Sequence, residues 1–135
     1  MKITLCGSIK FFDNMIEIQK QLESNGHEVY RPIKVENVDY FSEDGSSRIE
    51  AKKSLNLAKI HLDKIEASDA ILVANYTKGD IENYIGASTF LEMAFAHYRG
   101  KKIFVLNPLP KQKYIDDELQ AYDVIVLNSD LALIK

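Results

Sequence analysis

Two unbroken apolar runs constrain the fold of this chain more than any other feature. They span residues 70–75 and 102–106, and neither alternates apolar with polar side chains. Alternation is typical of a strand with one face in water, whereas a continuous run indicates a strand covered on both faces by helices. We therefore expect a parallel sheet buried between two helical layers.

Shorter segments extend these runs into a regular alternation of strands and helices. Further strands are predicted at residues 3–6, 27–31 and 124–127, and helices at residues 11–22, 48–66, 87–99 and 115–122. Residues 33–47 are polar and form a predicted long loop that could serve as a lid. We predict one α/β domain over residues 1–135, three-layered and flavodoxin- or Rossmann-like, with a five-stranded parallel sheet.

Composition excludes several classes of function. The net charge of −3 gives no basic footprint for a nucleic-acid polymer, and no apolar run is long enough for a membrane span or a signal peptide. A cytoplasmic protein is expected. The single cysteine, Cys6, excludes an internal disulfide and is interpreted as a packing residue.

The predicted topology also places the site. In open parallel sheets, ligands bind beyond the carboxyl ends of the strands, where the strand order reverses. The segments expected there are residues 7–10, the loop after Arg31, and residues 76–88.

One carboxylate stands out in this region. Gly86 and Ser88 are suited to opening a helix, and Glu92 follows one turn later. The helix dipole favours the charged form of a carboxylate at this position, whereas desolvation disfavours that form. This conflict is common at functional sites. The alternative is a solvent-facing acid near a helix start. The neighbours of Glu92 are small or apolar: Phe90, Leu91, Met93, Ala94, Phe95 and Ala96.

Three motifs together resemble the nucleoside 2-deoxyribosyltransferase family. They are Cys6-Gly7-Ser8-Ile9-Lys10 after the first strand, Ser68-Asp69-Ala70 before the third, and Glu92 on the following helix. The first motif is most similar to the 2′-deoxynucleoside 5′-phosphate N-hydrolases. Residues 83–97 resemble a deoxyribosyltransferase-like subgroup of bacterial and archaeal proteins.

The resemblance implies roles for individual residues. Glu92 would attack the anomeric carbon of a deoxyribose to form a covalent intermediate, which water or a second nucleobase resolves. Asp69 would be the acid that assists the leaving base. Further predicted contacts to the sugar, its 5′-phosphate or the base are Gly7, Ser8, Ile9, Lys10, Asn75, Gly86 and Ser88. No metal or redox cofactor is implied, and the partner is a small nucleoside or nucleotide.

Two other functions remain open at this stage. One is hydrolysis of NAD or another nucleotide conjugate, with room supplied by the loop at residues 33–47. The other is non-catalytic nucleotide sensing, because Thr4 replaces a tyrosine common in the family and Phe90 replaces a small residue. His61 and Lys64 share a helix face and either point at the ligand or are solvated; no second metal ligand accompanies His61 at a suitable spacing.

The sequence also predicts how the chain assembles. The helix at residues 87–99 is apolar around most of its circumference, more than one face of a sheet requires. We therefore expect a homodimer or a dimer of dimers with this helix at the interface and Glu92 near the subunit boundary, as the family resemblance also implies.

Overall fold

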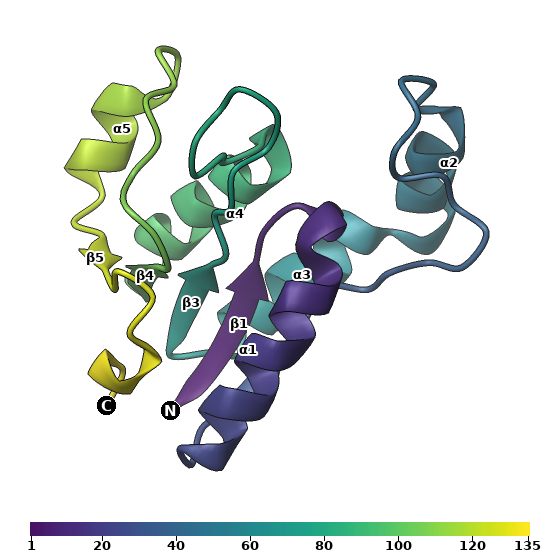
Figure 1. Ribbon diagram of the computed structural model, residues 1–135. Coiled ribbons are helices and arrows are strands. Elements are labelled where there is room, and N and C mark those ends of the chain that lie inside the picture. Colours follow the sequence, from purple (N-terminus) through teal and green to yellow (C-terminus); the bar gives the residue numbers. More distant parts are fainter.

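The computed structural model describes residues 1–135 and shows a parallel sheet between two layers of helices (Figure 1). The strands are β1 (Lys2–Cys6), β2 (Glu28–Tyr30), β3 (Ala70–Val73), β4 (Lys102–Val105) and β5 (Ile125–Val126). The α-helices are α1 (Phe12–Ser24), α2 (Ser46–Leu55), α3 (Leu57–Glu66), α4 (Ala87–Tyr98) and α5 (Asp116–Ala121). Two short 3₁₀ turns span Ile9–Phe11 and Leu131–Leu133.

All five strands are parallel, in the order β2-β1-β3-β4-β5. This confirms the predicted α/β class and the five-stranded parallel sheet. Every residue of β3 is buried, because helices cover both of its faces, and this explains the absence of polar residues from this strand. None of the helices combines the length and apolar character that a bilayer crossing requires.

Successive side chains along a strand point to opposite faces, and the core is divided accordingly. On one face, Ile3, Leu5 and Leu72 pack with α1 and with the C-terminal residues after β5. On the other face, Cys6 and Val73 join the side chains of α3, α4 and α5. The cysteine at the end of β1 is therefore directed into the layer that contains α3 and α4.

The strand order reverses between β1 and β3. The chain leaves β1 for the edge strand β2 and returns through α2 and α3 to β3, on the other side of β1. The loops that follow β1 and β3 thus diverge at the carboxyl edge of the sheet. Gly7 is needed at this point, since a Cβ there would lie 3.0 Å from the carbonyl oxygen of Ala74.

The predicted single helix at residues 48–66 is wrong. Asn56 adopts a left-handed conformation (φ 51°, ψ 46°) and separates α2 from α3. Asparagine tolerates this conformation better than most residues, and the periodicity of the apolar residues alone does not reveal such a break. Helix α2 buries only Ala51 and stands apart from the sheet at the end of the long loop (Figure 1).

Candidate active site

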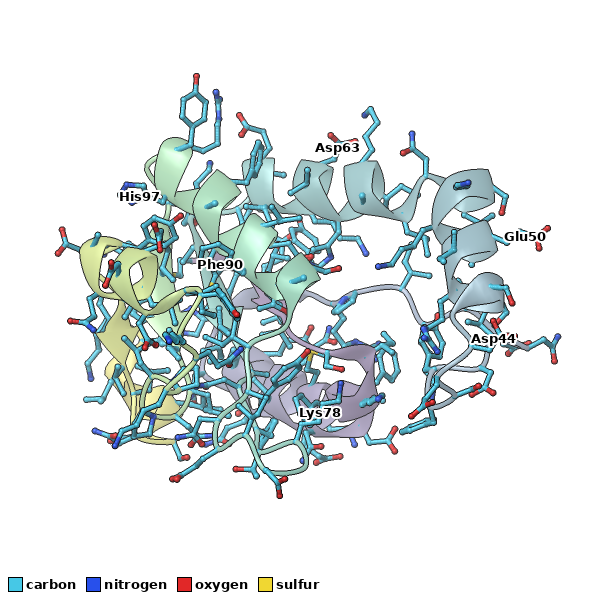
Figure 2. The ribbon with its side chains drawn as sticks, turned by 90° about the horizontal axis from the view of Figure 1, so that it is seen from above. Asp44, Glu50, Asp63, Lys78, Phe90 and His97 are labelled. Atoms are coloured by element: carbon cyan, nitrogen blue, oxygen red, sulfur yellow. The ribbon has the colours of Figure 1, made fainter.

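A cavity of about 510 Å³ lies at the carboxyl edge of the sheet. Its wall includes the loop after β1, the N-terminal half of α4, one face of α3, and Arg48, Ala51 and Lys52 of α2. Figure 2 looks down from above and shows α2, marked by Glu50, at the end of α3 and away from α4, with Lys78 in the loop that leads to α4. The cavity occupies the reversal point that the predicted topology indicates.

Glu92 extends from α4 into this cavity. Thr89, Met93 and Ala96 are the buried residues of α4, so the carboxylate lies beside the buried stripe with a side chain 17% exposed. Burial raises its pKa to about 8; a hydrogen bond from Cys6 and the charge of Lys52 oppose the rise. Glu92 therefore combines access to the cavity with a strongly perturbed pKa, as expected of a functional carboxyl group.

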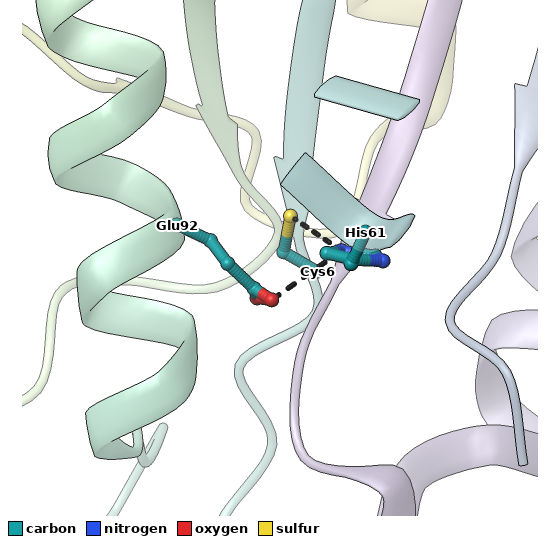
Figure 3. A group of neighbouring side chains, drawn as sticks. All are labelled: Cys6, His61 and Glu92. Atoms are coloured by element: carbon teal, nitrogen blue, oxygen red, sulfur yellow. Dashed lines mark hydrogen bonds and ion pairs between the residues drawn. The ribbon is translucent and has the colours of Figure 1, made fainter. Parts of the chain in front are cut away.

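Two further side chains meet Glu92, and both come from other elements (Figure 3). His61 of α3 places Nε2 3.5 Å from Glu92 Oε2, and the same nitrogen lies 3.5 Å from Cys6 Sγ. Burial, followed by the charge of Lys64, lowers the pKa of His61 to about 4. Burial and the nearby carboxylate raise the pKa of the Cys6 thiol.

The His61–Glu92 contact is therefore a neutral pair at pH 7 rather than an ion pair. At pH 7, a carboxyl group with a pKa near 8 retains its proton. An imidazole with a pKa near 4 is neutral at this pH and has a proton on only one ring nitrogen. The acid can donate its O–H to Nε2, which leaves the imidazole proton on Nδ1, an atom that is buried without a partner. The proton of the pair therefore rests on Glu92, next to an unprotonated imidazole nitrogen.

The rest of the cavity wall carries basic side chains. Lys10, Arg48, Lys52, Lys64 and Lys78 line the cavity, and none of them forms a salt bridge with an acidic side chain. Partial burial, followed by the charges of Lys78 and Arg48, lowers the pKa of Lys10. Glu92 is the only acid in the wall, so a ligand with negative charge is favoured.

The structure brings most of the predicted site residues together. Those that line the cavity are Gly7, Ser8, Ile9, Lys10, Gly86, Ser88 and Glu92. Ser8 caps the first 3₁₀ turn by accepting a hydrogen bond from the backbone N–H of Lys10. The hydroxyl of Ser88 accepts a hydrogen bond from Lys52, 3.3 Å away, and so ties α4 to α2 across the cavity mouth.

Asp69 lies away from the cavity, contrary to its predicted place in the site. It precedes β3 and therefore lies at the amino edge of the sheet, where its carboxylate accepts a hydrogen bond of 2.8 Å from the backbone N–H of Lys2. It does not line the cavity, which lies at the carboxyl edge one strand length away. The structure places His61, not Asp69, beside Glu92.

Asn75 does not line the cavity either, contrary to its predicted contact with a substrate. Its side chain is fully buried. The amide donates to the carbonyl oxygens of Asn107 and Pro108 and accepts from the N–H of Asn107. Asn75 thus joins the loops after β3 and β4, a structural role that uses both amide hydrogens and keeps the side chain out of reach of a substrate.

Thr4 and Phe90, which differ from the residues usual in the resembled family, lie outside the cavity. Thr4 is hydrogen-bonded to the hydroxyl of Ser68 at 2.7 Å, within the sheet–helix interface. Phe90 stacks on Tyr122, with ring centroids 6.1 Å apart, on the side of α4 that contacts α5. Neither residue narrows the space around Glu92.

Cys6, Lys52 and Lys78 are functional candidates that the sequence did not single out. Each lies in a different segment, and only the fold brings them to one cavity wall or, for Cys6, directly behind it. The one available signal was the position of Cys6 at a strand end beside Gly7. The donor atoms of Cys6, His61 and Glu92 all lie within 4.8 Å of one another, so these three residues could also hold a metal ion.

Comparisons with known proteins identify the fold. No protein-family model matches the sequence, and no curated protein matches it significantly. A 2-deoxyribosyltransferase from Bacillus psychrosaccharolyticus aligns with a TM-score of 0.55 and 21% identity, over 80% of this chain and 73% of that one. The CMP N-glycosidase of Clostridium botulinum aligns with a TM-score of 0.54 and 17% identity, over 95% and 90%. The chain has the fold of these two enzymes.

The pKa values predict that the protein loses stability relative to a Glu92→Gln variant as the pH rises above neutrality. With a folded-state pKa near 8, Glu92 holds a proton that the unfolded chain releases, so the free energy of unfolding falls as the pH rises towards 8. The lowered pKa of His61 opposes this trend only below 6.5. Between pH 6.5 and 8, the loss should be about 2 kcal/mol.

Urea unfolding in the presence of a chelator measures this difference. Glu66→Gln is the matched control, since Glu66 is exposed and Arg99 lowers its pKa, so it is ionised in both states throughout this range. A difference between the protein and Glu92→Gln that does not change with pH would contradict the raised pKa of Glu92.

Proposed function

We propose that this protein cleaves the N-glycosidic bond of a (deoxy)nucleoside or its 5′-monophosphate through a covalent intermediate on Glu92. The observation that carries the proposal is the placement of Glu92 in a basic cavity at the strand reversal, with His61 Nε2 3.5 Å from its carboxylate. The shared fold with a 2-deoxyribosyltransferase and a CMP N-glycosidase supports it.

In the first step, the proton of Glu92 passes to His61 Nε2, and the carboxylate attacks the anomeric carbon. The bond between that carbon and the nucleobase nitrogen breaks, and its electron pair leaves with the base. His61, now an imidazolium, returns the proton to the departing nitrogen. His61 thus takes the role that the family resemblance implied for Asp69.

In the second step, water or another nucleobase attacks the same carbon and releases Glu92. His61 accepts the proton of the incoming nucleophile, and the carboxylate recovers a proton as the resting pair is restored. Two displacements at one carbon retain its configuration. Water as the nucleophile gives a hydrolase, and a second base gives a transferase.

The basic wall supports a phosphorylated substrate. Lys10 and Lys78 approach each other from the loops after β1 and β3, and the charge of Lys78 disfavours the charged form of Lys10 until an anion lies between them. A 5′-phosphate provides that anion. The name of the Clostridium botulinum neighbour identifies a nucleoside monophosphate, CMP, as the substrate of that enzyme.

A substrate panel separates the remaining alternatives. Incubation with nucleosides, deoxynucleoside monophosphates and NAD, followed by chromatography, measures which base is released. Release from NAD alone would favour the hydrolase of nucleotide conjugates. Binding without release from any of them would favour nucleotide sensing, although Thr4 and Phe90, which motivated that alternative, lie outside the cavity.

A second copy of the chain is the proposed partner. Phe90 and Phe95 of α4 pack within their own subunit, but Leu91 at the cavity wall is 67% exposed, and Ile60 of α3, in the same wall, is 36% exposed. These two side chains are the apolar surface that a symmetry-related helix would cover.

Glu92→Gln should abolish base release while preserving the fold, because the amide keeps the shape of the side chain and lacks the attacking oxygen anion. A 2-fluoro-arabinosyl substrate analogue, which slows breakdown of the intermediate, should leave a mass adduct on a peptide containing Glu92. Retention of most of the activity by the variant, or an adduct on another residue, would overturn the assignment.

His61→Asn should lower kcat by roughly 10²- to 10⁴-fold, the usual range for loss of a general acid. The matched variant Asp69→Asn should change kcat by less than about threefold, since Asp69 lies at the far edge of the sheet. The His61 effect should shrink for an N7-methylated purine substrate, whose base leaves without protonation. Equal effects on both substrates would argue against proton donation by His61.

Lys10→Ala and Lys78→Ala should each weaken binding of a 5′-monophosphate by roughly 10- to 100-fold, as expected for loss of a charge-assisted hydrogen bond. Binding of the unphosphorylated nucleoside should change little. Lys113→Ala, at an exposed lysine outside the cavity, is the control. An equal loss for both ligands would mean that the lysines contact a part of the substrate other than phosphate.

Leu91→Arg should convert the proposed dimer to monomer, because it places a charge in the apolar contact. Light scattering at micromolar concentration measures the mass, and Tyr98→Arg, at the exposed far end of α4, tests whether the contact is confined to the cavity end. A wild-type protein that is monomeric and fully active would contradict the proposed assembly.

A further inference from the structure

Cys6, His61 and Glu92 converge on one point from three elements. Cys6 is the last residue of β1, His61 lies in the middle of α3, and Glu92 lies in the second turn of α4. Figure 3 shows the sulfur and the carboxylate on two sides of the same imidazole nitrogen. A single ring nitrogen has one proton or one lone pair, so it cannot form two good hydrogen bonds at once.

The distances match those between the ligands of a tetrahedral metal ion. With zinc–sulfur bonds of about 2.3 Å and zinc–nitrogen and zinc–oxygen bonds of about 2.0–2.2 Å, neighbouring ligand atoms in a tetrahedron lie roughly 3.3–3.6 Å apart. Here the Sγ–Nε2 and Nε2–Oε2 distances are both 3.5 Å, and all three atoms lie within 4.8 Å of one another. Binding an ion would require the third edge, between Cys6 Sγ and the carboxylate of Glu92, to close to a similar length.

We propose that these three side chains bind a thiophilic divalent cation, with Zn²⁺ the best fit, and that the bound ion inhibits the enzyme. Thiolate, imidazole and carboxylate are all zinc ligands, and three protein ligands leave a fourth position that faces the cavity and takes water. The ion occupies the oxygen of Glu92 that attacks the sugar. Metal binding itself does not depend on the proposed function, whereas the inhibition does.

The charges around the site limit its affinity. A thiolate and a carboxylate neutralise the dication, but Lys52 and Lys64 lie near Glu92 and His61 respectively and disfavour a further positive charge. His61 Nδ1 has no carboxylate or carbonyl partner to strengthen the imidazole as a ligand. The site should therefore bind zinc reversibly, more weakly than closed structural zinc sites do.

Co²⁺ titration of the chelator-treated protein tests the binding without any nucleotide. A near-ultraviolet sulfur-to-cobalt charge-transfer band should appear and should be lost on addition of Zn²⁺. Cys6→Ser should abolish the band, and Cys6→Ser and Glu92→Gln should each weaken Zn²⁺ binding by more than about 100-fold, since even an outer-shell partner contributes 10- to 100-fold. His97→Gln removes an exposed histidine outside the cluster and should bind as the wild type does.

Absence of the sulfur-to-cobalt band, or equal Zn²⁺ affinity in wild type and both cluster variants with native circular dichroism, would overturn the metal site. Base release measured with and without Zn²⁺ then tests the inhibition. Loss of activity at saturating Zn²⁺, restored by chelator, supports it, and activity unchanged by bound Zn²⁺ refutes it. A protein that binds zinc but releases no base from any nucleotide would refute the proposed function while leaving the metal site supported.

Discussion

The parallel pairing of β1 with β3 determines where every part of the site lies. It is the point at which the strand order reverses, so the loops that follow these two strands diverge and leave the cavity between them. The same pairing orients Cys6 towards the helical layer that contains His61 and Glu92. A shift of one residue in this register would turn Cys6 to the opposite face and place Leu5 behind the carboxylate.

The sheet was predictable because its cause is local. A strand covered on both faces has no polar positions, and residues 70–74 and 103–106 carry that pattern in their own composition. The break at Asn56 was not predictable in this way, because a left-handed residue changes the direction of the chain without interrupting the apolar spacing on either side. Periodicity indicates that residues are helical, but it does not locate a break between two consecutive helices.

Part of the site could be predicted from the sequence, and the misplacement of Asp69 has a physical cause. Glu92 and the loop from Gly7 to Lys10 follow from topology, since they lie where parallel strands end. Asp69 violates the same rule: it leads into β3 and so belongs to the opposite edge of the sheet. His61 could be placed only once the packing of α3 against α4 was known, because its partner is 31 residues away in the sequence.

Helix α2 has a consequence for how this protein can change over evolutionary time. It contributes Arg48, Ala51 and Lys52 to the cavity wall but buries only Ala51 in the core. Substitutions along most of this helix therefore alter what the cavity recognises without disturbing the packing that keeps the domain folded. Selection for a new ligand can act on α2 while the sheet, Glu92 and His61 remain unchanged, so recognition and chemistry are free to diverge independently in descendants of this chain.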